Sequence, residues 1–224
     1  MPSVILELLP VAIAAALTPT AVLAVILLMF SAKARRNGAA FLFGWYVGLL
    51  ILSWLIVSLL IRLGFFSSLV GGYSVPAGLI TLLGLLLLLF ALQQWLTRPK
   101  AGTSLAAPAW FDRVDSLGPG HSFGIGAALA SITPKMILLT LVAAVVIGQS
   151  VSDPGETLAA DFFYASLGSL LVAAPVVLYV RQGERAKQTF VRWKDWLLRN
   201  NNAVMAIVSL LMGMALLGAG LAQL

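Results

Sequence analysis

The chain has 224 residues, of which 61% are hydrophobic and only 10% are charged. A soluble domain carries about 25% charged residues, so this composition excludes an ordinary soluble globule and predicts an all-α integral membrane protein. There is no cysteine, which excludes disulfides and thiolate metal sites. The net charge is +6, which we interpret as membrane topology rather than as a surface for nucleic acid.

Six apolar stretches are long enough to cross a bilayer, which requires about 20 apolar residues per helix. The predicted transmembrane helices are 4–30, 39–61, 75–96, 122–148, 160–180 and 203–222. We expect a first three-helix repeat over residues 1–97 and a second over residues 122–224. A cytoplasmic linker rich in Pro and Gly, 98–121, joins them.

Basic residues gather in alternate loops of this predicted topology. Nearly all of the 14 lysines and arginines lie in the loops after the first, third and fifth spans, whereas the opposite loops hold only Arg62. Cytoplasmic loops retain positive charge. We therefore expect a multi-pass protein of the bacterial inner membrane with these three loops in the cytoplasm and both termini outside.

The two halves share a motif in their first spans. Residues 15–23 and 130–138 both read Ala-x-x-Thr-Pro-x-x-x-Leu. Three spans per copy place the copies in opposite orientations, so the repeat predicts two inverted halves, an architecture common among transporters.

Each copy of the motif places a Thr-Pro pair inside a predicted span. Proline lacks the backbone donor and opposes the carbonyl four residues earlier, whereas threonine followed by proline favours a helix start. We predict that helices 1 and 4 are broken at Thr18-Pro19 and at Thr133-Pro134, each second half-helix beginning at the proline. A plain kink is the alternative.

The two predicted breaks lie near the bilayer centre, and the starting end of a half-helix suits an anion. Lys135 adds a full positive charge there. An ionisable residue at this depth costs at least about 2.5 kcal/mol, which makes Lys135 a candidate functional residue, the alternative being a lysine that caps a carbonyl within the bundle. The candidate substrate-binding residues are Thr18, Pro19, Thr20, Thr133, Pro134 and Lys135.

Other polar residues offer little for catalysis. The chain has one histidine and no acidic pair at midplane depth, and Asp161 is expected at the outer mouth of the fifth span. We therefore expect neither an enzyme, nor catalytic residues, nor a metal site.

Residues 185–199 mix basic side chains with Phe190, Trp193 and Trp196 at roughly helical spacing. This pattern predicts an amphipathic helix on the cytoplasmic leaflet. An extension of the fifth helix that ends in a turn at 200–202 is the alternative. The candidate residues for recruiting anionic headgroups are Lys33, Arg35, Arg36, Arg185 and Arg192.

Small residues at four-residue spacing line two predicted helices, Gly44 with Gly48 and Gly124 with Ala128. Such faces allow close helix packing. We expect packing within the monomer rather than a dimer contact.

Four segments are shared with one known family: Thr18-Pro19, the first loop from Ser31 to Gly38, the stretch from Phe43 to Gly48, and Ile132 to Lys135. Together they resemble the GAP family of sulfolipid-addressing or peptidoglycolipid-addressing proteins, in the lysine exporter (LysE) superfamily. The resemblance implies six spans, outward movement of envelope glycolipids and no known cofactor. Thr133 stands where the superfamily's amino acid exporters carry Asn before Pro-Lys, a departure that argues against amino acid substrates.

Our leading hypothesis is a transporter or flippase that exports an anionic lipid, glycolipid or lipid-linked envelope precursor by alternating access. An exporter of a small amphiphile or amino acid, and a non-transporting accessory subunit of a lipid-export complex, are the alternatives. The expected partners are the anionic lipid substrate, membrane lipids, and a second copy of the chain or a larger lipid-export complex, without nucleic acid.

Overall fold

The computed structural model describes residues 2–64, 77–98, 117–150 and 153–222, which fold into helices without a strand among them. In chain order the helical elements are α1 (Pro2–Ala16), α2 (Pro19–Leu28), α3 (Ala34–Arg62), α4 (Ala77–Leu96), α5 (Pro119–Ile132), α6 (Pro134–Ser150), α7 (Pro154–Gly168), α8 (Leu170–Gln182), the 3-10 turn η3 (Gly183–Arg185) and α9 (Ala186–Leu221). The predicted all-α class is confirmed. Most of the predicted linker, residues 99–116, lies outside the described residues.

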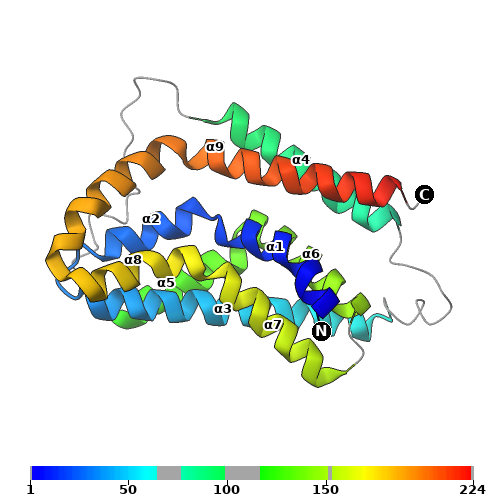
Figure 1. The fold of residues 1–224 in the computed structure, drawn as a ribbon, viewed down its shortest axis with the longest axis horizontal. Helices are drawn as coiled ribbons and strands as arrows, with labels where there is room; N and C mark the ends of the chain where they lie inside the picture. The colour runs from blue at the N-terminus through cyan, green and yellow to red at the C-terminus, as the bar shows by residue number, and fades with distance from the viewer. Residues whose placement is uncertain (1, 65–76, 99–116, 151–152, 223–224) are drawn as a thin grey trace.

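Both predicted helix breaks are present. α2 begins at Pro19 and α6 begins at Pro134, each directly after the threonine. The axes bend by 52° between α1 and α2 and by 64° between α5 and α6. The two broken segments run in opposite directions (Figure 1).

The helices are those of a multi-pass membrane protein. Within the described residues, three helical segments are long and apolar enough to cross a membrane, and the number rises to five if each bent pair is one span. Large apolar side chains on the outer faces, such as Leu55 on α3, Leu89 on α4 and Leu211 on α9, are more than half exposed. Lipid tails cover such faces at no cost.

The fifth and sixth predicted spans differ from the observed helices. The predicted span 160–180 is shared between α7 and α8, which are separated at Ser169. The predicted span 203–222 is the second part of α9 rather than a helix of its own. The count of six spans therefore stays a prediction.

No turn separates residues 185–199 from the last span. Asn200, Asn201 and Asn202 are helical, so the surface segment and the span form one continuous helix, α9. Two of the asparagine side chains bond to other segments: Asn202 donates to the Thr97 carbonyl at 3.2 Å, and Asn201 accepts from the Thr20 hydroxyl at 3.2 Å. The third, Asn200, donates to the Trp196 carbonyl in the preceding turn at 2.8 Å. With their side chains bonded to other segments, Asn201 and Asn202 compete less with the helix backbone.

α4 and α9 lie side by side along the upper edge of the molecule (Figure 1). Glycines set this close approach, because a Cβ added to Gly84 on α4 would lie 2.6 Å from the backbone nitrogen of Leu217 on α9. A Cβ on Gly213 would lie 3.0 Å from the Gly84 carbonyl oxygen. Small residues at both sides of the contact bring the two backbones together.

α3 and α5 form a second close pair, also through glycine. A Cβ on Gly44 would lie 2.1 Å from the Phe123 carbonyl oxygen, and one on Gly48 would lie 2.8 Å from that of Ala127. The prediction that this face packs within the monomer is confirmed. It is wrong for Gly124, where an added Cβ meets nothing within 4 Å.

Candidate functional site

The first break is stabilised by its own threonine. Thr18 is buried, and its hydroxyl donates to the Ala15 carbonyl oxygen at 2.7 Å. That carbonyl is the one that Pro19, having no N–H, leaves without a helical donor. Thr18 occupies the N-cap position of α2, but its side chain makes no capping bond there, so the expected side-chain cap is corrected. The carbonyl freed by the proline is the acceptor instead.

The second break lies nearer the surface. The Thr133 hydroxyl likewise donates backwards, to the Leu129 carbonyl, and the Thr133 backbone is extended. Ile132 and Pro134 on either side of it are exposed, whereas Thr18 and Pro19 are buried. In both breaks the threonine bonds to an earlier carbonyl, but only Thr18 bonds to the one that its proline frees, and the two environments differ.

Lys135 connects the two breaks. Its side chain is 1% exposed, and Nζ donates to the Leu17 carbonyl oxygen at 2.7 Å. The Met205 sulfur on α9 lies 3.6 Å from the same nitrogen. A second contact joins the segments, from the Thr18 hydroxyl to the Met136 sulfur at 3.5 Å. The start of α6 thus lies against the start of α2.

This arrangement is the carbonyl-capping alternative that the sequence left open for Lys135. One of the three N–H donors of the ammonium group bonds to the Leu17 carbonyl, and no carboxylate pairs with the group among the described residues. A buried charge with so few partners is only partly compensated.

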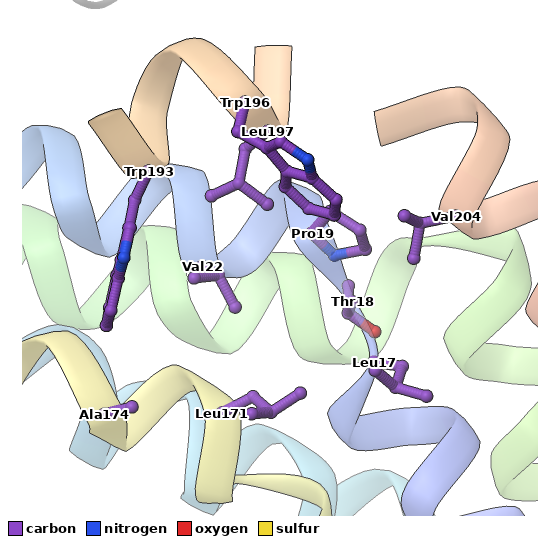
Figure 2. A pocket seen from close by; sticks show the side chains of 10 residues that line it. All are labelled: Leu17, Thr18, Pro19, Val22, Leu171, Ala174, Trp193, Trp196, Leu197 and Val204. Carbon is purple, nitrogen blue, oxygen red and sulfur yellow. The ribbon is translucent and has the colours of Figure 1, made fainter. Parts of the chain in front are cut away.

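A cavity of about 390 Å³ lies beside the first break. Its lining residues come from the α1–α2 break, α8 and α9, and every side chain except that of Thr18 is apolar or aromatic; they are Leu17, Thr18, Pro19, Val22, Leu171, Ala174, Trp193, Trp196, Leu197 and Val204. Figure 2 shows the α9 tryptophans on one side of the cavity and Leu171 and Ala174 of α8 on the opposite side. None of the lining residues comes from the second break.

The first part of α9 forms a wall of this cavity. The sequence predicts that the apolar face of residues 185–199 lies on the lipid surface. In the structure, Phe190 and Leu197 on this face are buried in the protein instead. Trp193 and Trp196 line the cavity while remaining partly exposed, at 38% and 55%. The helical spacing of Trp193, Trp196 and Leu197 is the signal that predicts a shared face, although it does not reveal what the face contacts.

Thr20 ties α2 to α9 rather than facing the cavity. Its hydroxyl lies 3.2 Å from the Asn201 side-chain oxygen. Of the six candidate substrate-binding residues, the structure brings Thr18 and Pro19 to the cavity and holds Lys135 at the break next to it. Thr133 and Pro134 lie on the outer side of the second break.

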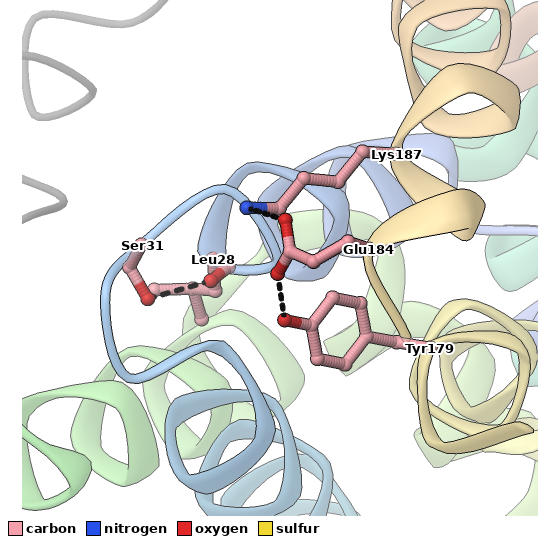
Figure 3. A network of polar contacts seen from close by, with 5 residues as sticks. All are labelled: Leu28, Ser31, Tyr179, Glu184 and Lys187. Carbon is pink, nitrogen blue, oxygen red and sulfur yellow. Dashed lines mark hydrogen bonds and ion pairs between the residues drawn. The ribbon is translucent and has the colours of Figure 1, made fainter. Parts of the chain in front are cut away.

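The five candidate headgroup-recruiting residues, Lys33, Arg35, Arg36, Arg185 and Arg192, are all exposed. Figure 3 shows the α2–α3 turn and the η3 turn near one another at one end of the molecule. Ser31 closes the first turn by donating to the Leu28 carbonyl at 2.7 Å, and Glu184 accepts from Tyr179 at 2.7 Å and pairs with Lys187 at 2.8 Å. The ten residues of α2 separate this end from the first break, which is about 15 Å of helix.

Asp161 is buried instead of lying exposed at a mouth. Its carboxyl group is on the face of α7 that packs against α3, where the Ser53 hydroxyl donates to it, and its side chain is 2% exposed. The predicted interfacial position of Asp161 is wrong. Counting residues along the helix gives the depth of a side chain in the span, but it does not show which face of the helix packs against the protein.

A comparison with protein families matches residues 8–222 to the model described as "Sap, sulfolipid-1-addressing protein". No curated protein and no solved structure is significantly similar to the chain.

Proposed function

Because the chain belongs to the sulfolipid-1-addressing protein family, we propose that it exports an anionic lipid or glycolipid across the membrane that it spans. Membership implies a membrane role related to lipid. The transport step, the binding site and the direction are our proposal, and the apolar cavity at the first break is the observation that carries it.

The cavity suits an acyl chain. Its volume of about 390 Å³ lies within the range of about 300–1,000 Å³ of small-molecule pockets. Thr18 is the only lining residue with a hydroxyl, and that hydroxyl is already bonded to Ala15. An amino acid needs partners for an ammonium and a carboxylate group, since burying either without partners is costly. The lining therefore favours a lipid tail over an amino acid.

Lys135 is the group that we assign to the headgroup. Within the described ranges its charge has only the Leu17 carbonyl and a thioether as partners, so a sulfate or phosphate oxygen arriving at the break gains a charge-assisted hydrogen bond. Because Nζ is buried at the break, we propose that it leaves the Leu17 carbonyl when it moves to the headgroup. Substrate binding and opening of the first break are then one event.

In this proposal, transport requires a movement of two inverted halves of the chain against each other. We take α1–α2, α3 and α4 as one half and α5–α6, α7–α8 and α9 as the other, giving six spans. The contacts are compatible with such symmetry, since α2 packs against α9 and α6 packs against α4. Rocking of one half against the other would expose the site to each side in turn, as in other transporters with inverted repeats.

The basic end faces the cytoplasm in this proposal. Lys33, Arg35, Arg36, Arg185 and Arg192 would gather anionic headgroups there, each basic residue near the surface contributing about 1 kcal/mol. The tail would enter beside the partly exposed tryptophans of α9. The lipid would leave at the opposite end.

The test is a flipping assay in proteoliposomes, with a fluorescent sulfated glycolipid and a fluorescent phosphatidylcholine as the neutral comparison. The wild-type chain should move the sulfated probe faster. Lys135→Met should slow it at least about tenfold, which corresponds to about 1.4 kcal/mol. Lys135→Arg should retain part of the rate, and Lys194→Met serves as the control for loss of a lysine elsewhere.

Wild-type rates from Lys135→Met would contradict the assignment of the headgroup to Lys135. A purified wild-type chain that moves neither probe would contradict the transport function itself and favour an accessory subunit.

A further inference from the structure

A buried polar cluster lies apart from the first break, between α3, α6 and α7. We call it the Asp161 cluster, and it consists of Ser53, Thr140, Asp161 and Tyr164. Each of the four side chains is at most 2% exposed. Nothing in the lipid pathway proposed above uses these residues.

The cluster contains two hydrogen-bonded pairs. The Ser53 hydroxyl donates to Asp161 Oδ1, and the hydroxyls of Thr140 and Tyr164 lie 3.0 Å apart. Asp161 and Tyr164 are three residues apart on α7 and so share one face of the helix. The second carboxyl oxygen, Asp161 Oδ2, is buried and has no hydrogen-bond partner in the described part of the chain.

In the described part of the chain Asp161 also has no ion-pair partner, and the pair of Lys187 with Glu184 lies in the α8–α9 region. The charged residues on α7 itself and on the helices packed against it are Glu7, Arg35, Arg36, Arg62, Lys135, Glu156 and Arg181. All of them are exposed except Lys135, which is bonded to Leu17.

An ionised carboxylate in such a place is costly. A charge buried in an apolar interior needs a counter-ion or several hydrogen bonds, and Asp161 has one hydroxyl donor. With a proton on Oδ2 the group is neutral, and a buried O–H without an acceptor costs less than a buried charge without a counter-ion. A carboxyl group that is protonated when buried and ionised when exposed to water can take up a proton on one side of the membrane and release it on the other.

We propose that Asp161 is a proton-binding site and that its protonation from the outer side drives lipid export, an inference that rests on the function proposed above. In the outward-open form a proton from water bonds to Oδ2. In the inward-open form this O–H bond breaks, the electron pair stays on the carboxylate, and the proton passes to cytoplasmic water. The lipid moves in the opposite direction.

The position of the cluster fits this direction. The helix that carries Asp161, α7, begins towards the end of the molecule opposite the α2–α3 and η3 turns (Figure 1). A sodium ion is a poor alternative occupant, since it requires several oxygen ligands and, among the residues that the structure describes, Ser53 is the only group bonded to the carboxyl.

A structural path joins the proton to the headgroup site. Thr140, which is paired with Tyr164, lies on α6 five residues after Lys135. A deprotonated Asp161 requires a further donor, and the Tyr164 hydroxyl is the nearest phenol on its own helix face. Loss of the Tyr164–Thr140 bond would remove one polar contact that links α7 to α6, and the first turn of α6 holds the Lys135–Leu17 contact.

The first experiment measures flipping of the fluorescent sulfated glycolipid with and without an imposed pH gradient, acidic on the outer side. The wild-type chain should give a ratio of the two rates above one, and Asp161→Asn should give a ratio of one. Glu156→Gln, which removes an exposed carboxylate from the same helix, should keep the wild-type ratio. A gradient response in Asp161→Asn, or a response to a sodium gradient instead of a pH gradient, would overturn the proposal.

The second experiment does not depend on transport. Infrared spectroscopy of the purified wild-type chain should show the band of a protonated carboxyl group at neutral pH, and Asp161→Asn should remove it. Ser53→Ala keeps the carboxyl but removes a donor that favours its ionised form, so the band should persist to higher pH. Absence of the band from the wild-type chain would overturn the proton site, whereas its presence in a chain that moves no lipid would leave the site intact and overturn only the proposed function.

Discussion

Lys135 of the second broken segment donates to the carbonyl oxygen of Leu17 in the first, over 2.7 Å. The two residues are more than half the chain apart in sequence. Through this bond the charged side chain at the second break is an additional donor to a backbone carbonyl at the first. The cavity beside the break is lined by Leu17 itself. A change at Lys135 is therefore transmitted directly to the wall of the candidate lipid site.

Replacing Thr18 by valine should destabilise the first break. The change keeps the shape of the side chain and removes the bond to the Ala15 carbonyl, which Pro19 cannot replace. A buried carbonyl left without a donor costs about 1–3 kcal/mol. Thermal unfolding in detergent measures the loss.

The matched control for this variant is Thr157→Val. The Thr157 hydroxyl makes the same kind of bond, to the Asp153 carbonyl at 3.0 Å, but the bond is exposed and that carbonyl also accepts from the Thr157 backbone N–H. Equal destabilisation by both variants would show that the first break does not depend on Thr18.

Gly44→Ala should lower stability more than Gly124→Ala. The added Cβ at Gly44 would lie 2.1 Å from the Phe123 backbone, so α3 and α5 must separate, whereas the one at Gly124 meets open space. Overpacking of this kind costs about 1–3 kcal/mol. The melting temperatures of the two variants in the same detergent compare the two faces, and similar values would argue against the close α3–α5 contact.

The helix starts at Pro19 and Pro134 were predictable from the repeated Thr-Pro pair. Proline alone would not have been enough, because Pro10 and Pro175 lie inside α1 and α8. The partner of Lys135 was not predictable, since nothing near it in sequence points to the Leu17 carbonyl.

Two further features depended on tertiary packing in the same way. Helical spacing indicated that Trp193 and Trp196 share a face, but a lipid surface and a protein cavity are equally apolar. The unbroken course of α9 depended on side-chain bonds of Asn201 and Asn202 to α2 and to the end of α4.

Filling the cavity should block the lipid but leave the fold intact. Ala174→Leu adds three carbons to the lining on α8, which the open volume of about 390 Å³ accommodates. We expect the flipping rate of the sulfated probe to fall several-fold with an unchanged melting temperature. Ala159→Leu, at an exposed position on α7, should leave the rate unchanged. Full activity in Ala174→Leu would argue that the tail binds elsewhere.

The basic end should affect transport through lipid recruitment and in a salt-dependent way. Neutralising Arg35 and Arg36 to glutamine should lower the initial rate at limiting probe by about fivefold for each charge, from about 1 kcal/mol per residue. High salt should reduce the difference, since exposed charges are screened. Arg62→Gln, at the other end of α3, is the control. A deficit that is equal in low and high salt would contradict recruitment by charge.

The most direct measurement is an electron cryomicroscopy map of the chain in lipid nanodiscs, with and without a sulfated glycolipid. We predict that, when the lipid is bound, the map shows acyl-chain density between α9 and the first break and a headgroup at Lys135. Lys135 should then be separated from the Leu17 carbonyl. A map at saturating lipid with the cavity empty and the Lys135–Leu17 bond intact would contradict this prediction.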